Sequence, residues 1–157
     1  MFKEHSMTRH FENAASLAAE LGKPIGPGDW LEITQAQIDE FADATGDRQW
    51  IHVDIERAAR EAPGGKTIAH GYLLLALLGK LQPALFTVGS PRVLNVGLNK
   101  LRFLAPVPSG ARVRLMQTVS EVEPQGAGTR ITFATVFELE SASKPALVTD
   151  IVFLYFD

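Results

Sequence analysis

The chain has 157 residues, of which 46% are hydrophobic and 21% are charged, enough apolar material for one domain with a buried core. Its formal net charge is −3 and it has no long run of Lys or Arg, so a partner such as nucleic acid or an anionic membrane is not expected. The absence of cysteine excludes disulfide bonds and thiolate metal sites.

The sequence shows no targeting or membrane-spanning segment. Its beginning lacks the apolar core of a secretory signal, and its most apolar run, residues 71–78, is far shorter than the ~20 residues that cross a bilayer. The histidines near the N-terminus have no carboxylate partner at a metal-ligand spacing. We therefore expect a cytoplasmic protein with no metal and no separate cofactor.

The first 27 residues are expected to form a helical extension and linker in front of a main domain over residues 28–157. The pattern predicts an amphipathic helix over about 8–21, followed by a turn region rich in Pro and Gly. Apolar residues recur there at helical spacing, at Phe11, Ala14, Ala15, Ala18 and Leu21.

A short strand is expected over Trp30–Ile33, and a helix then runs to Gly46. Thr34 is a candidate N-cap, with Gln37 completing a capping box, and Gly46 is the expected C-terminal stop. Asp47 therefore lies in irregular chain just past a helix end. Farther on, Asp54 is expected to cap a short helix over residues 55–61.

The next helix, which begins at Gly71, is apolar on every side to Leu78. A helix without a polar face must be surrounded by protein, and Pro83 is expected to mark its end. Extended segments rich in Val, Ile, Thr and Phe follow, separated by short turn sequences, at about residues 92–104, 112–122, 129–139 and 146–156. Short connections favour antiparallel neighbours.

These elements predict an α+β fold in which an antiparallel sheet wraps around the central apolar helix. A single curved sheet has open edges, and a bare edge invites pairing with another strand. We therefore expect a homodimer that continues the sheet.

Two sequence motifs resemble those of a known family. One is Phe41-Ala-x-x-Thr-Gly-Asp47-x-x-x-x-His52-x-Asp54, and the other is Ile68-Ala-His70-Gly71. Together they resemble the MaoC-like (R)-specific enoyl-CoA hydratases of the hot-dog fold, and the run from Thr45 to Asp54 is closest to the nodulation-protein-N-like branch. The resemblance covers roughly residue 28 to the C-terminus. It implies homodimers that hydrate trans-2-enoyl-CoA to (R)-3-hydroxyacyl-CoA.

The chain departs from the family pattern at a few positions. Gln49 stands where Asn is common, and Trp50 where Pro is common. Ala76 occupies a position on the central helix where many members carry Ser, close to the catalytic pair. An alanine cannot donate the hydrogen bond that a serine there would make.

Hydration of an enoyl thioester suits an acid and an imidazole that share one water molecule. Asp47 and His52 are the candidate pair, with Asp47 deprotonating the water and His52 delivering the second proton, or the reverse. They are five residues apart, so they diverge on a helix but can converge in a loop. By family resemblance, the amide of Gly71 at the start of the buried helix is the donor to the thioester oxygen.

Several other residues are candidates for substrate contact. His70 either shapes the turn beside Gly71 or takes part in chemistry. Trp50 and Tyr72 either limit the acyl tunnel or fill the core or dimer seam. Polar residues that could touch coenzyme A, with surface or sheet-edge roles left open, are Asn95, Asn99 and Arg102.

Other functions remain open at this point. A hot-dog acyl-CoA thioesterase would need a similar pocket but would release a free thiol. A dehydratase acting on carrier-bound 3-hydroxyacyl groups would use the same pair in the opposite direction. A non-catalytic acyl-CoA-binding subunit is the remaining alternative, which Ala76 keeps open.

Overall fold

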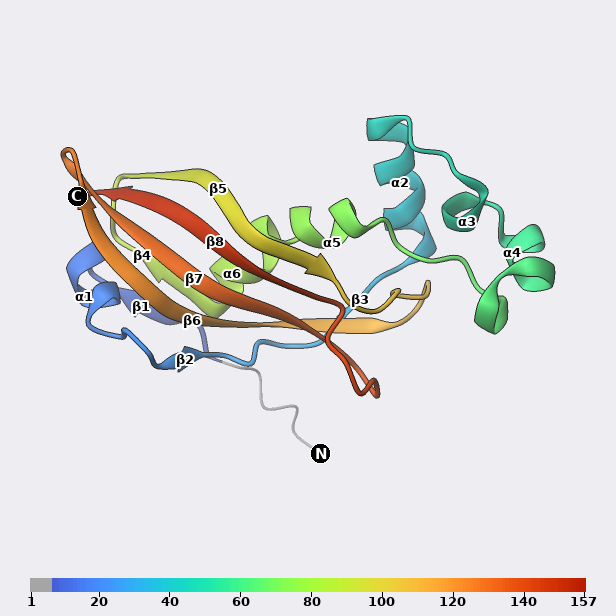
Figure 1. The fold of residues 1–157 in the computed structure, drawn as a ribbon, viewed down its shortest axis with the longest axis horizontal. Helices are drawn as coiled ribbons and strands as arrows, with labels where there is room; N and C mark the ends of the chain where they lie inside the picture. Colours follow the sequence, from blue (N-terminus) through green and yellow to red (C-terminus); the bar gives the residue numbers. More distant parts are fainter. Residues whose placement is uncertain (1–6) are drawn as a thin grey trace.

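The computed structural model describes residues 7–157. Figure 1 shows how its elements are arranged. In chain order the helices and strands are β1 Arg9–Phe11, α1 Ala14–Ala18, β2 Pro24–Ile25, β3 Leu31–Glu32, α2 Gln35–Thr45, α3 Trp50–Val53, α4 Ile55–Glu61, η1 Pro63–Gly65, α5 Gly71–Ala76, α6 Leu78–Leu85, β4 Phe86–Val88, β5 Arg92–Phe103, β6 Arg112–Gln125, β7 Gly128–Leu139 and β8 Leu147–Phe156.

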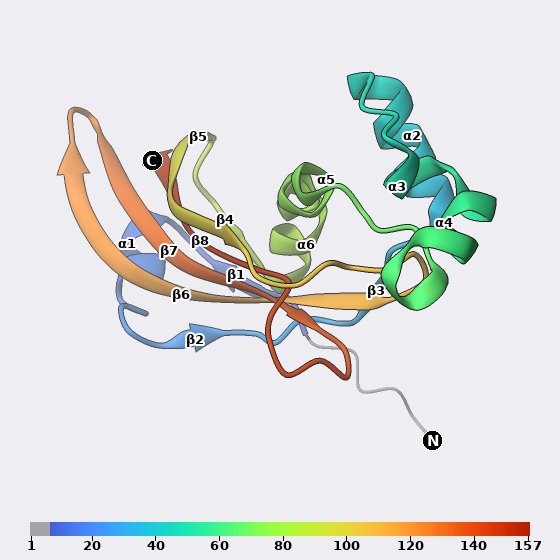
Figure 2. The same ribbon diagram turned by 45° about the vertical axis from the view of Figure 1, so that its right-hand side comes forward.

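One antiparallel sheet forms the body of the molecule, in the order β2-β6-β7-β8-β5, and β3 also pairs with β6. The register places Leu115 beside Phe137 and Phe137 beside Leu147, so that one face of the sheet is apolar across three strands. Figure 2 shows this sheet curving around α5 and α6. The prediction of an antiparallel sheet around a central helix is confirmed.

The central helix differs from its prediction in two ways. Pro83 does not end it: the helix is interrupted at Leu77, and Pro83 lies inside α6, which continues to Leu85. Nor is α5 covered on every side in the single chain. Leu73 and Leu74 are buried against the sheet, but the Tyr72 side chain is 68% exposed. The uncovered flank of α5 therefore remains available to another surface.

The helix predicted over residues 8–21 is wrong in extent. Only Ala14–Ala18 is helical, because Asn13 and Ser16 form a capping box that starts the helix there. Residues 9–11 instead pair in parallel with β4. Leu17 and Ile25 lie in the same hydrophobic core as the central helix. The first six residues of the expected extension lie outside the described part of the chain.

The two edges of the sheet differ in whether their outer side is paired with another strand. The outer edge of β6 is paired with β2 and β3, both drawn from the N-terminal part of the chain. β5 pairs with β8 on one side and, among residues 7–157, with nothing on the other. Large apolar side chains are exposed along or beside it, at Val93, Leu94, Val96, Phe103 and Leu104.

The segment from α2 to α4 stands apart from the sheet at one end of the molecule, beyond the first turn of α5 (Figures 1 and 2). We call it the overhang, residues 35–65. Across the described chain, no helix is both long and apolar enough to pass through a membrane.

Candidate active site

Asp47 is positioned by the end of α2. The predicted capping box of Thr34 and Gln37 starts this helix, and Gly46 ends it with a φ of 79° and an N–H that donates to the Ala42 carbonyl at 2.8 Å. A glycine suits this left-handed conformation, which most side chains disfavour. The chain then turns, so that Asp47 leaves the helix axis.

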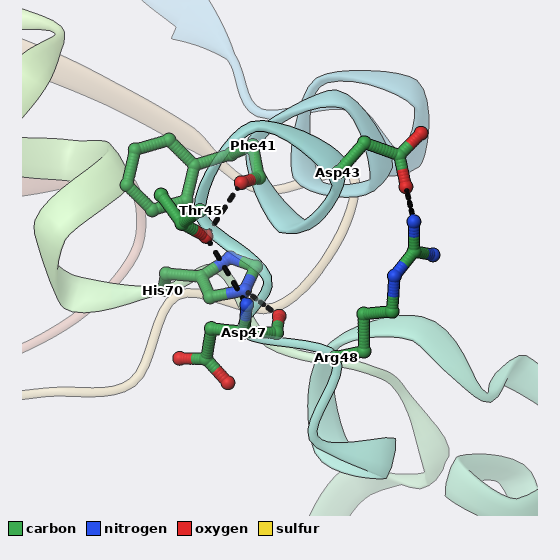
Figure 3. A network of polar contacts seen from close by, with 6 residues as sticks. All are labelled: Phe41, Asp43, Thr45, Asp47, Arg48 and His70. Atoms are coloured by element: carbon green, nitrogen blue, oxygen red, sulfur yellow. Dashed lines mark hydrogen bonds and ion pairs between the residues drawn. The ribbon is translucent and has the colours of Figure 1, made fainter.

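Thr45 fixes the backbone at this turn (Figure 3). Its hydroxyl donates to the Phe41 carbonyl at 2.7 Å and accepts a hydrogen bond from the Asp47 N–H at 3.3 Å. Nearby, Arg48 is paired with Asp43, and the Asp47 side chain points away from that ion pair. The Asp47 carboxylate accepts a long hydrogen bond from the Gln49 N–H at 3.4 Å but forms no ion pair with Lys or Arg among the described residues, so it can accept further hydrogen bonds from a ligand.

His52 lies on the short helix α3, which begins three residues after Asp47, so the pair is not formed within a continuous loop as expected. Its ring is buried, and its Nδ1 lies 2.7 Å from the Ile68 carbonyl oxygen. A carbonyl oxygen only accepts, so Nδ1 carries the hydrogen and Nε2 keeps a lone pair. His52 is thereby held in the tautomer that can accept a proton at Nε2.

His70 ties the two parts of the site together. Its Nε2 lies 2.9 Å from the Asp47 carbonyl oxygen, and its ring stacks on that of His52 with centroids 3.8 Å apart and planes 23° apart. The side chain is buried and its Nδ1 has no hydrogen-bond partner. His70 therefore fixes both the backbone of Asp47 and the ring of His52.

Asp47, His52 and His70 converge at one place. Each offers a carboxylate oxygen or ring nitrogen within 4.8 Å of those of the other two, and all three line a cavity of about 500 Å³. We call this the dyad cavity and refer to Asp47 and His52 as the dyad. Carboxylate oxygens and deprotonated ring nitrogens are acceptors, and a water molecule supplies the matching donors. The set could also ligate a metal ion, which the spacing of residues in the sequence did not suggest.

Gly71 begins α5 at the wall of the dyad cavity. Its amide makes no hydrogen bond to another described residue, as expected for the first turn of a helix. A Cβ at this position would lie 2.8 Å from the Phe103 ring. The glycine is thus required by the close approach of Phe103, a contact that the sequence did not reveal.

The structure separates the other candidate residues. Tyr72 lines the dyad cavity, whereas Trp50 does not and instead stacks under Arg57 at 4.3 Å. Asn99 and Arg102 are exposed and line no described cavity. Asn95 lines a different cavity, and its side chain accepts a hydrogen bond from the Gly97 N–H.

That other cavity, the second cavity, has a volume of about 770 Å³ and lies between α5, α6 and the beginning of β5. Ala76 lines it and does not line the dyad cavity of its own chain. Its wall is mostly apolar, and its polar groups come from Tyr72, Gln82, Thr87, Asn95 and Tyr155. Burial raises the pKa of the Tyr155 phenol.

Sequence reasoning missed several supporting residues. Gln35 donates to the His52 carbonyl at 2.8 Å and accepts from the Thr67 hydroxyl, so it links α2, α3 and the strand-like segment before α5. Thr45 and Phe103 were also missed. Thr45 bonds to residues close to it in sequence, whereas the partners of Gln35 and Phe103 are distant in sequence and carry no local signal.

Known proteins resemble this chain over most of its length. The model of the MaoC like domain matches residues 16–139. The 3-hydroxyacyl-thioester dehydratase Z of Mycobacterium tuberculosis is 51% identical over 149 residues, covering 94% of this chain and 98% of that protein. Nodulation protein N of Rhizobium leguminosarum bv. viciae is 40% identical over 156 residues, covering 94% of each.

Solved structures share the fold. The R-hydratase PhaJ1 of Pseudomonas aeruginosa superimposes with a TM-score of 0.72 at 25% identity, covering 88% of this chain and 83% of that one. The hot-dog fold expected from the sequence is confirmed by this likeness and by the curved sheet around α5 and α6.

Proposed function

Because the chain belongs to the MaoC-like domain family, we propose that it interconverts trans-2-enoyl thioesters and 3-hydroxyacyl thioesters by adding or removing water. The observation that carries the proposal is the convergence of Asp47 and His52 in one cavity beside the first turn of α5. The dehydratase named among the relatives supports the reaction class, and the R-hydratase of similar fold supports the (R) configuration.

In the hydration direction, the dyad holds one water molecule. The Asp47 carboxylate takes a proton from that water as its oxygen attacks C3 of the enoyl group. That proton passes to the free Nε2 of His52 and from there to C2, so that the elements of water are added across the double bond and both groups return to their starting state. Since one water contacts both groups, the opposite assignment of the two proton transfers is the alternative within this mechanism.

The thioester oxygen gains negative charge during the reaction. The unpartnered amide of Gly71 points out of the first turn of α5, where the helix dipole is positive. We assign this amide as the donor to the oxygen. One such donor is worth roughly 10²–10³ in rate.

We propose coenzyme A as the thioester carrier, with a carrier-protein substrate as the alternative. Three polar residues of the edge strand β5 remain candidates for contact with the polar portion of coenzyme A: Asn95, Asn99 and Arg102. The dehydratase of Mycobacterium tuberculosis is named for acyl thioesters in general, so the carrier is a matter for experiment.

We also propose a homodimer formed through β5. Its unpaired edge runs for 12 residues and is flanked by exposed apolar side chains, and a second copy of β5 can satisfy the free backbone groups by antiparallel pairing. The exposed Tyr72 would be covered by the same contact. Sedimentation equilibrium of the wild-type protein tests this, and a monomer would contradict it.

The reaction is tested with crotonyl-CoA. Loss of the enoyl absorbance without release of free thiol, followed by chiral analysis of the 3-hydroxybutyryl product, is the expected result. Thiol release would instead favour a thioesterase, and binding without turnover would favour an acyl-CoA-binding subunit. Turnover only with a carrier-protein thioester would move the substrate to the carrier-bound class.

A further inference from the structure

His70 contacts three parts of the candidate site at once. Its side-chain Nε2 lies 2.9 Å from the Asp47 carbonyl oxygen, and its ring lies on that of His52, with the centroids 3.8 Å apart. Its own backbone carbonyl accepts a hydrogen bond from the Leu73 N–H at 3.1 Å, in the first turn of α5. One buried residue therefore joins the acid, the imidazole and the helix start that carries the Gly71 amide.

The hydrogen bonds of the two stacked rings fix opposite tautomers. A carbonyl oxygen only accepts, so His70 carries its hydrogen on Nε2, toward Asp47, whereas His52 carries its hydrogen on Nδ1, toward Ile68. The Nδ1 of His70 is buried and has no hydrogen-bond partner among the described residues. A second proton there would create a buried charge whose N–H finds no acceptor. The contacts of His70 therefore favour an uncharged ring.

Neighbouring rings hold His70 in one orientation. Its side chain is buried, the Phe41 ring lies against it with centroids 5.0 Å apart and planes 55° apart, and the His52 ring is stacked on it. Since its Nε2–H is bonded to Asp47 and its Nδ1 is buried, neither nitrogen of His70 is placed to exchange a proton with a substrate. His52, whose Nε2 keeps a free lone pair, is the ring that can do so.

We propose that His70 is a positioning residue for the proton transfer through Asp47 and His52. In the proposed reaction, on which this inference rests, His52 holds on Nε2 the proton taken from water until that proton passes to C2. Its ring is a cation during that time. The face of an uncharged aromatic ring carries partial negative charge and attracts a cation stacked on it. The ring of His70 thus stabilises charged His52, its N–H holds the backbone of Asp47, and it gains and loses no proton itself.

Three substitutions at position 70 separate the ring contact from the hydrogen bond. His70→Phe keeps an aromatic ring beside His52 and removes the donor to the Asp47 carbonyl. His70→Gln keeps a side-chain N–H for that carbonyl and removes the ring. His70→Ala removes both. kcat and KM are measured with crotonyl-CoA for each variant and for the wild type, and circular dichroism measures the folded fraction.

We expect kcat to fall about 100-fold in His70→Ala and about tenfold in His70→Phe and in His70→Gln, because each of the last two keeps one of the two contacts. KM should stay within about twofold of the wild type, since His70 acts through Asp47 and His52. An unchanged kcat per folded molecule in all three variants would reduce His70 to a structural role. Equal losses in all three, as large as that of His52→Ala, would make it a proton-transfer group. Either result would overturn the inference.

Nuclear magnetic resonance of the wild-type protein, labelled with nitrogen-15 in histidine, tests the inference without a change at position 70. The resonances of His70 and His52 are assigned by their loss in His70→Phe and His52→Ala. At the pH of the assay we expect His70 to carry hydrogen on Nε2 alone and His52 to carry it on Nδ1 when uncharged. A charged His70, or one with hydrogen on Nδ1, would overturn the inference even if every variant at position 70 failed to fold.

His10→Phe is the matched control. It makes the same change at a histidine of β1 that lines neither cavity and whose Nδ1 lies 2.9 Å from the Thr87 hydroxyl oxygen. It should keep the wild-type kcat. Full activity in His70→Ala would overturn the inference and leave the proposed function standing, whereas a wild-type protein with no turnover of any thioester would overturn both.

Discussion

The dyad cavity and the second cavity are built from different materials. The first is placed by the overhang, where a helix end, a single turn of α3 and hydrogen bonds to backbone carbonyls hold two histidines and an aspartate. The second is placed by regular helix and strand, with small side chains on α5 and α6 and aromatic ones opposite. The proposed catalytic groups are thus positioned largely by a helix end and loops, whereas the second cavity is formed by regular helices and strands.

The largest effect should come from removing either member of the dyad. Asp47→Ala and His52→Ala are expected to lower kcat for hydration by about 10²–10⁴, and to the same extent for short and long acyl chains. Stopped assays across enoyl-CoA chain lengths measure this, with circular dichroism to confirm folding.

Asp54→Ala is the matched control for the dyad variants. Asp54 caps α4 by accepting from the Arg57 N–H at 2.9 Å, so its loss should cost about 1 kcal/mol of stability. Its kcat should remain that of the wild type. Near-normal turnover in either dyad variant would remove the mechanism.

Gly71→Ala should give the next largest loss of activity, because Gly71 lies where the dyad cavity meets the first turn of α5. The added methyl group would lie 2.8 Å from the Phe103 ring, and such overpacking costs about 1–3 kcal/mol. We expect a lower midpoint of urea unfolding and a lower kcat as α5 shifts. Gly71→Ala combined with Phe103→Leu should recover most of the stability, and failure to do so would show that the contact is not the cause.

Alkaline pH should lower the free energy of unfolding through Tyr155, which lines the second cavity and not the dyad cavity. Burial raises its pKa, so the folded chain keeps the phenolic proton while the unfolded chain releases it above pH ~10. The free energy of unfolding therefore falls as the pH rises past that value, by at most about 1.4 kcal/mol per pH unit from this group. Urea titrations at neutral and alkaline pH should show a smaller loss for Tyr155→Phe, and equal losses would contradict the assignment.

Ala76→Ser should have the smallest effect on folding. Ala76 is exposed in the single chain and faces open space in the second cavity, so a hydroxyl group can remain hydrated. We expect a change within about 0.5 kcal/mol by thermal unfolding. Gross unfolding would mean that Ala76 is packed in a way that the second cavity does not allow.

The sequence correctly predicted the helix ends that depend on residues next to them in the chain. The capping box at Thr34 and the glycine stop at Gly46 are where the sequence placed them, because both depend on neighbouring residues. The long strands also matched, since their patterns are long. β1, β2 and β4 were missed because they are two or three residues long and exist through partners far along the chain. The same reason explains the failed helix over residues 8–21.

The candidate site shows the same division. The sequence could select Asp47, His52 and Gly71 because they stand in motifs with recognisable spacing. It could not show that His70 stacks on His52, or that Phe103 packs on Gly71, because these contacts join residues 18 and 32 positions apart. Nor could it show that Ala76 lines a different cavity from the dyad of its own chain, because that depends on how α5 is rotated against the sheet.

The pairing of β2 and β3 with the outer edge of β6 has a consequence for assembly. A sheet with two bare margins could recruit copy after copy and lengthen into a fibre. Here β2 and β3 pair with the first half of β6, whereas β5 has no second partner strand among residues 7–157, so strand-to-strand addition is favoured at β5. The two short strands β2 and β3 thus help to prevent strand pairing between copies from continuing into a fibre.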